Sequence, residues 1–156
     1  MAQRQYVVMM IAKEKYGVDV QQVKSIEKMM PITKVPQTVP YIKGVVNLRG
    51  VVTPVIDLRE RFGFTGGSDD DADVRIAVVQ VDEMQVGMVV DAVSDVMSVN
   101  EQDIEPAPAV VGGVQAVYLR GVARVNNQLY ILLNLDKILS DTQASQLREV
   151  EKSVHG

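Results

Sequence analysis

The chain contains two copies of one sequence pattern, and this repeat constrains the fold more than any other feature. YIKGVVNLRGVVTPVIDLRERF, from Tyr41, aligns without a gap with YLRGVARVNNQLYILLNLDKIL, from Tyr118, at an offset of 77 residues. The identical pairs are Tyr41 with Tyr118, Gly44 with Gly121, Val45 with Val122, and Leu58 with Leu135. An upstream stretch repeats at an offset of 70, where the matched pairs are Ile11 with Val81, Gly17 with Gly87, Val20 with Val90, Val23 with Val93, and Ile26 with Val96. The repeat predicts two similar modules in tandem, and the seam between them offers a groove for a partner.

Composition indicates that the modules are built from strands and share one core. A chain of 156 residues is one domain's worth and buries roughly 70% of its unfolded surface, whereas each half alone would be marginal. Valine dominates the apolar residues and Trp is absent; β-branched side chains favour strands over helices. We predict a mainly β fold with subdomain 1 at about residues 6–64, subdomain 2 at about 74–139 and a C-terminal helix at about 140–153.

Charge and hydropathy narrow the classes of partner. A net charge of −4 and a pI near 5.0 argue against nonspecific binding to nucleic acid or anionic lipid. The absence of cysteine excludes disulfides and thiolate sites and fits a reducing compartment. The apolar run at the N-terminus is too short for a secretion signal, and no stretch approaches the ~20 apolar residues of a membrane span. We expect a cytoplasmic protein without direct membrane insertion.

Local patterns predict the element order within each copy. Residues 6–12 read as a strand followed by a turn at 13–15, and residues 18–26 mix a period of two with a period near three. A bulged strand and a helical turn are both compatible with that mixture. Prolines at 31, 36 and 40 then predict an extended loop. In the second copy the corresponding turn is expected at 82–84.

Both copies end in a predicted hairpin. The first turns at Leu48, Arg49 and Gly50, and the second at Asn126 and Asn127, residue types suited to positive φ. Residues 57–63 predict one or two helical turns, stopped by glycine. The acidic, glycine-bearing residues 65–73 read as the linker between copies.

The residue inventory argues against an enzyme. The single histidine, His155, lies in a polar tail, and no nucleophile motif or phosphate-binding loop is present. The acidic cluster at 69–73 lacks the spacing of a calcium loop, so a solvated linker is the preferred interpretation. We therefore predict no catalytic residue, no metal and no cofactor.

Two features remain as candidate contact sites. The apolar residues spaced by three cannot all face one side of a flat strand, so their division between core and surface stays open. Arg49 is expected to be exposed at its turn, where a solvated arginine and an interface hot spot are both possible.

The segment IKGVVNLRGVVTPVIDLR resembles the signature of the CheW family, the coupling proteins of bacterial chemotaxis. YGVDVQQVKSIEK and VGMVVDAVSDVMSV resemble the family's first-module and second-module strands, so the resemblance covers nearly the whole chain. It implies two intertwined, SH3-like, five-stranded β-barrels that share a hydrophobic centre. It also implies a non-enzymatic adaptor that couples the cytoplasmic tips of chemoreceptors to the histidine kinase CheA, recruited to membrane-associated receptor arrays.

The resemblance also implies which residues bind partners. The family motifs place receptor or kinase contacts at Arg49, Val23, Ser25, Ile26, Glu27, Gly87, Val93 and Val96. Ser25 stands where the family often has a glutamate. Glu27, two positions on, would point to the same side of a regular strand and so could replace it.

Two alternative functions stay open at this level. One is a coupling or regulatory domain cut from a larger signalling protein, although Met1 near the first strand and the end at residue 156 favour a free-standing protein. The other is a β-barrel peptide-binding module from outside chemotaxis.

Overall fold

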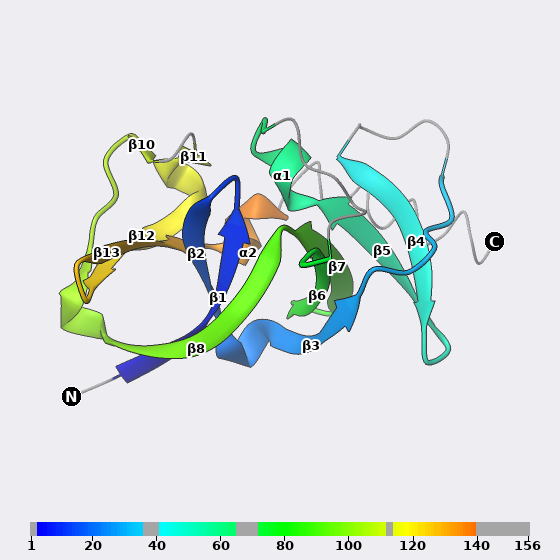
Figure 1. Cartoon of the computed structure of the whole chain (residues 1–156), viewed down its shortest axis with the longest axis horizontal. Helices are drawn as coiled ribbons and strands as arrows, with labels where there is room; N and C mark the ends of the chain where they lie inside the picture. Colours follow the sequence, from blue (N-terminus) through cyan, green and yellow to red (C-terminus); the bar gives the residue numbers. More distant parts are fainter. Residues whose placement is uncertain (1–2, 36–40, 65–71, 112–113, 140–156) are drawn as a thin grey trace.

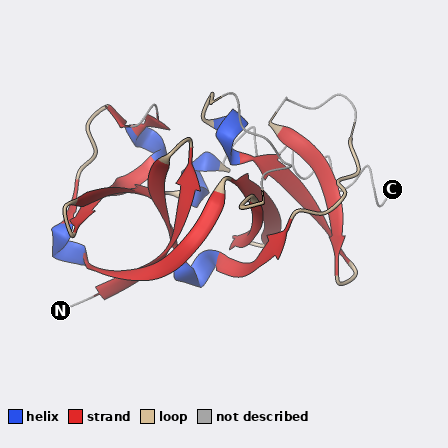
Figure 2. Ribbon diagram, in the orientation of Figure 1, coloured by secondary structure: helices blue, strands red, loops and turns tan. Residues whose placement is uncertain are grey.

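The structure is a computed structural model that describes residues 3–35, 41–64, 72–111 and 114–139. The predicted C-terminal helix at 140–153 and nearly all of the predicted linker lie outside these ranges. Among the described residues, strands dominate and the helices are short (Figure 2). The prediction of a mainly β fold is confirmed.

The elements follow the repeat. The strands of the first copy are β1 (Gln3–Ile11), β2 (Glu14–Asp19), β3 (Val23–Lys28), β4 (Ile42–Leu48) and β5 (Val51–Asp57). Their counterparts are β6 (Arg75–Val81), β7 (Met84–Val90), β8 (Ala92–Asn100), β12 (Leu119–Val125) and β13 (Gln128–Leu133). The second copy adds the two-residue strands β9 (Ile104–Glu105), β10 (Val110–Val111) and β11 (Val114–Gln115). The helices are α1 (Leu58–Arg61) and α2 (Leu135–Ile138), and the 3₁₀ turns are η1 (Val20–Gln22), η2 (Glu101–Asp103) and η3 (Ala116–Tyr118).

Each of the two large sheets takes strands from both sequence copies. One sheet has six strands in the order β8-β1-β2-β13-β12-β9, and the other has five in the order β3-β6-β7-β5-β4 (Figure 1). Strand β3 of the first copy pairs with β6 of the second, and β8 of the second copy pairs with β1 of the first. The two sequence copies therefore do not coincide with the two sheets. The expected number of five strands is confirmed for one sheet, whereas β9 adds a sixth strand to the other.

A short return segment covers the far edge of each sheet. Thr33, downstream of β3, exchanges two 2.9 Å backbone hydrogen bonds with Val45 of β4. In the other copy Glu105 of β9, downstream of β8, pairs with Val122 of β12. The chain that starts on one edge strand thus returns to the opposite edge, as a barrel requires.

Glycine at the repeated positions 44 and 121 allows this closure. Gly44 has φ +142 and Gly121 has φ +153, and a Cβ on either would collide with the backbone carbonyl of Thr33 or Glu105. Only glycine permits such close approach of a second strand in this conformation. This requirement explains why both copies keep the glycine.

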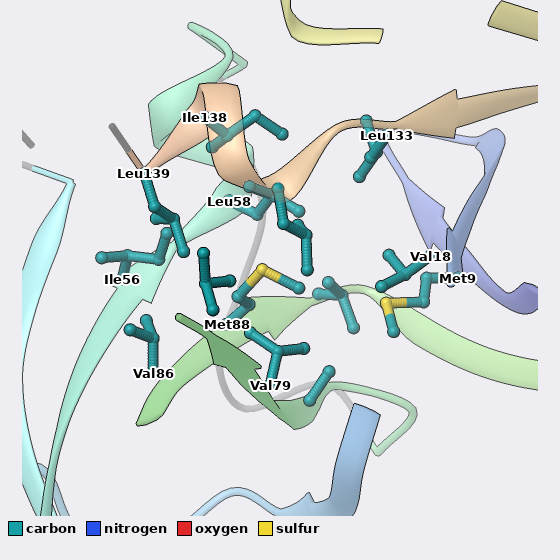
Figure 3. Close-up of a cluster of buried hydrophobic side chains, with 14 of the residues drawn as sticks. Met9, Val18, Ile56, Leu58, Val79, Val86, Met88, Leu133, Ile138 and Leu139 are labelled. Atoms are coloured by element: carbon teal, nitrogen blue, oxygen red, sulfur yellow. The ribbon is translucent and has the colours of Figure 1, made fainter. Parts of the chain in front are cut away.

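The sheets share one apolar centre. The largest buried cluster combines Met9, Val18 and Leu133 of the six-stranded sheet with Ile56 and Met88 of the five-stranded sheet (Figure 3). Two smaller clusters each draw their buried residues from one sheet or from residues next to it. The expectation of a shared hydrophobic centre is confirmed.

Bulges explain the apolar residues spaced by three. In β3 the register passes from Val23 opposite Val79 to Ser25 opposite Val78, which brings Ile26 opposite Ala77. Val79 and Ala77 both belong to the shared core. Because cross-strand partners lie on the same side of a sheet, Val23 and Ile26 face the same side despite their spacing.

The same result arises differently in the second copy. Val93 pairs with Met9 and Val96 with Val7, so two residues of β8 oppose only Val8 of β1. Met9 and Val7 are both in the shared core. In the first copy, η1 lies directly before β3. Both the bulge and the helical turn that the sequence allows there are therefore present.

The predicted turns are mostly confirmed. Arg49 and Gly50 have φ of 50° and 85°, and Asn126 and Asn127 have 51° and 65°. Helix α1 is followed by Gly63 at φ 83°, as predicted. The first turn begins earlier than the predicted residues 13–15, since Ala12 already has φ 51° and β2 begins at Glu14.

Candidate partner-binding surface

The most exposed of the predicted site residues is Arg49, on the β4–β5 turn. Its side chain is 73% exposed. Asn47 Oδ1 accepts a 2.9 Å hydrogen bond from Gly50 N, which fixes the turn beneath it. The arginine is thus held by a rigid two-residue turn, while the second copy has Asn126 at the matching position.

Glu27 of β3 is the ionic partner of Arg49. Arg49 Nη2 donates to Glu27 Oε2 at 3.2 Å. By register Ser25 and Glu27 oppose Val78 and Ile76, which confirms that both lie on the same side of β3. A hydrogen bond from the Ser25 side chain, and secondly the contact with Arg49, lowers the pKa of Glu27. The structure therefore brings three predicted residues together.

An open groove of about 290 Å³ is lined by Arg49 and Ser25 of this group, and we call it the Arg49 groove. Its lining is Lys24, Ser25, Leu48, Arg49, Val51, Val78 and Gln85. Strand β3 and the β4–β5 hairpin contribute most of these residues, although they belong to opposite edges of the five-stranded sheet. The curvature of the sheet thus brings both edges to one groove, which combines apolar side chains with polar and charged ones.

Sequence reasoning missed Lys24, Val51 and Gln85. Gln85 Nε2 donates to Thr53 Oγ1 at 2.9 Å, which ties β7 to β5 at the groove. These residues lie on different strands with no shared local motif, so only the sheet order brings them together. The sequence signal that could have found one of them is the apolar Val51 directly after the predicted turn, which the structure shows to be exposed.

The remaining apolar site residues lie on the edge strands β3 and β8. Ile26 is 38% exposed and Val96 is 52% exposed, whereas Val23 and Val93 are half-buried against the shared core. Each edge strand thus presents one exposed apolar side chain beside a half-buried one. Val93 and Val96 are the counterparts of Val23 and Ile26 in the repeat at an offset of 70 residues.

Gly87 lies apart from this accessible surface. It is buried in β7, and a Cβ there would approach Ile76 Cγ2 to 2.8 Å. A partner could contact it only if the strand opened. The structure therefore places Gly87 among the packing residues, and its predicted role as a direct contact does not fit its burial.

Potential metal ligands do not gather within the part of the chain that the structure describes. No group of three or more His, Cys, Asp or Glu within 3–35, 41–64, 72–111 and 114–139 is placed to hold a metal ion. Across those same ranges, no helix is long and apolar enough to cross a membrane. The fold and the surface together define a two-barrel β protein with an exposed, ion-paired arginine at one barrel end.

Comparison with known proteins gives the family. A family model described as a CheW-like domain matches residues 5–143. The chain is 35% identical to the chemotaxis protein CheW of Klebsiella aerogenes, covering 96% of this chain and 90% of that protein. It is 40% identical to CheW of Bacillus subtilis, over 90% and 88% of the two chains.

A solved structure agrees in fold. The scaffolding protein TtCheW from Thermoanaerobacter tengcongensis superposes with a TM-score of 0.82 at 34% identity, covering 92% of each chain. The chain belongs to the CheW family of chemotaxis scaffold proteins. The family resemblance recognised from the sequence is confirmed.

Proposed function

We propose that this protein is a non-enzymatic chemotaxis adaptor that couples chemoreceptor tips to the histidine kinase CheA. In this role it brings receptor and kinase together, so that the receptor controls autophosphorylation of the kinase. It acts in the cytoplasm and is recruited to receptor arrays at the membrane. Family membership favours this function over that of a peptide-binding module from outside chemotaxis.

The observation that carries the proposal is the exposed Arg49 on its rigid turn. A fixed arginine beside apolar side chains is a typical hot spot of protein interfaces, because little side-chain entropy is lost when the partner binds. The Arg49 guanidinium donates to Glu27 in the free protein, and a carboxylate or carbonyl of the partner would compete with Glu27 for this hydrogen bond. Ser25 and Glu27 belong to the same proposed contact.

The edge strands supply the apolar part of the proposed receptor contact. A receptor tip is a helical hairpin, and an amphipathic helix binds through apolar residues that enter a groove. Ile26 and Val96 are exposed, and Val23 and Val93 lie beside them. We assign the receptor contact to these four residues and propose a packing role for Gly87.

Co-sedimentation with receptor-containing membranes and the purified kinase tests the proposal. We expect the protein to pellet with the receptor membranes, to increase the amount of kinase in the pellet, and to raise receptor-controlled autophosphorylation. Membranes without receptor are the control. A protein that binds neither partner and leaves kinase activity unchanged in their joint presence would refute the adaptor function.

A further inference from the structure

A buried ion pair anchors Arg59 of α1 to the five-stranded sheet. Asp57, the last residue of β5, accepts from Arg59 Nε and Nη2, both at 2.9 Å, and caps α1 by accepting from Arg59 N at 3.0 Å. The two side chains are only 6% and 3% exposed. Such a two-pronged contact fixes the plane of the guanidinium.

The third arm of the same guanidinium points to the other sheet. Arg59 Nη1 donates to Asp91 Oδ1 at 3.1 Å. Asp91 lies where the chain passes from β7 to β8, that is, from the five-stranded to the six-stranded sheet. Its Oδ2 accepts from Ala12 N at 2.8 Å, and its own N donates to Met10 O at 2.9 Å. Arg59 is therefore connected through Asp91 to β1, by the backbone of Asp91, and to the β1–β2 turn, by its carboxylate.

A second arginine of α1 makes an independent contact across the copies. The guanidinium carbon of Arg61 lies 5.3 Å from the ring centre of Tyr41 and 4.8 Å from that of Tyr118. These tyrosines are the equivalent residues of the two copies. Helix α2 has Asp136 and Ile138 where α1 has Arg59 and Arg61. Only the first copy therefore supplies arginines to these contacts between the copies.

We call the contacts of Arg59 with Asp57 and Asp91 the Arg59 bridge, and it differs in kind from the apolar core that also joins the sheets. The shared core consists of aliphatic side chains, methionine and tyrosine, and apolar packing is non-directional. The planar fork of arginine, in contrast, binds two carboxylates in one fixed geometry, which lysine cannot reproduce. The bridge supplies a directional contact that the core lacks.

We propose that Arg59 is a positioning residue that fixes the orientation of the two sheets relative to each other. It thereby sets the position of the Arg49 groove, on one sheet, relative to Val93 and Val96, on the edge of the other. The functional importance of this placement rests on the proposed adaptor function, whereas the role of Arg59 in the orientation of the sheets does not.

Spin labels measure the orientation directly, because the chain has no cysteine of its own. Cysteines at the exposed positions Glu83 and Leu129 report the distance between the sheets, and cysteines at Glu83 and Val51 report a distance within the five-stranded sheet. We expect Arg59→Lys to broaden or shift the first distance distribution and to leave the second unchanged. Arg124→Lys, at an exposed position of β12, is the matched control and should change neither.

Two results would overturn the proposal. One is an unchanged distribution between the sheets in Arg59→Lys, and the other is equal broadening of both label pairs, which indicates general loss of packing. If Arg59→Lys does not fold, Asp91→Asn replaces it, because this variant keeps the buried pair of Asp57 and Arg59. An unchanged distribution between the sheets in Asp91→Asn would then count against the proposal.

Receptor and kinase binding test the functional consequence. We expect Arg59→Lys to bind each partner alone within about threefold of the parent, yet to lose roughly tenfold in receptor-controlled kinase activity. Full kinase control by a variant with an altered sheet distance would contradict this consequence. If the parent protein itself fails to activate the kinase, the adaptor function is wrong, but the label measurement still decides the role of Arg59.

Discussion

At the scale of single residues, the contact of Arg49 with Glu27 shows what a sequence can and cannot predict. The exposed turn arginine follows from the hairpin pattern, and the side of Glu27 follows from the strand period of two. Their meeting depends on the curvature of the five-stranded sheet, which brings opposite edges together. No local pattern encodes that curvature, so the ion pair itself could be recognised only in the structure.

The pKa of Glu27 gives a prediction for pH-dependent stability. Because the folded-state pKa is lowered from 4.5, the charged carboxylate stabilises the protein above the unfolded pKa, and this contribution is lost as pH falls through the folded pKa. Glu27→Gln should therefore be slightly less stable than the parent near neutral pH, and the difference should shrink in acid. Urea unfolding across this range measures it, with Glu105→Gln as the exposed control. A difference that stays constant with pH would contradict the assignment.

At the scale of elements, the sequence left open which side the apolar residues of β3 and β8 face. The sequence could not show which apolar residues spaced by three share a side, because in β8 the irregularity depends on the register against β1, about 90 residues away in the chain. Hairpin turns, in contrast, were predictable because their residue types act locally. Non-local register is the part that sequence patterns leave undetermined.

The exposed valine of β8 gives a prediction at this scale. Val96→Lys should weaken binding to receptor membranes by about tenfold, because it places a charge in the proposed apolar contact. The melting temperature should hardly change, since the side chain is 52% exposed. Leu129→Lys, at 43% exposure on the same sheet, is the matched control. Equal loss of receptor binding in both variants would indicate a nonspecific effect of charge.

At the scale of the whole molecule, the repeat predicted duplication and the chain length predicted a shared core, but neither predicted the exchange of strands. Because β3 and β8 are equivalent in the two copies, each could pair with its own copy or with the other without any change in pattern. The structure shows the exchanged pairing, with β3 on β6 and β8 on β1. Each sheet is consequently incomplete without the other half of the chain.

This exchange predicts how the halves behave when separated. A chain cut within residues 65–71 should give two fragments that fold together but not alone, because each large sheet needs strands from both. Circular dichroism of each fragment and of the mixture measures this, with the cut but unseparated protein as the control. A fragment that folds alone with cooperative unfolding would contradict the interdependence of the sheets.

We propose that Arg49 couples the two partners without supporting the fold. Arg49→Ala should lower the melting temperature only slightly, because an exposed ion pair contributes little to stability and because alanine and arginine incur a similar steric cost at φ 50°. The same variant should bind its partners more weakly by about 2 kcal/mol. Receptor-controlled autophosphorylation of the kinase should fall with this loss of binding. Full kinase control by Arg49→Ala, or a loss of control that only follows a lower melting temperature, would contradict the account.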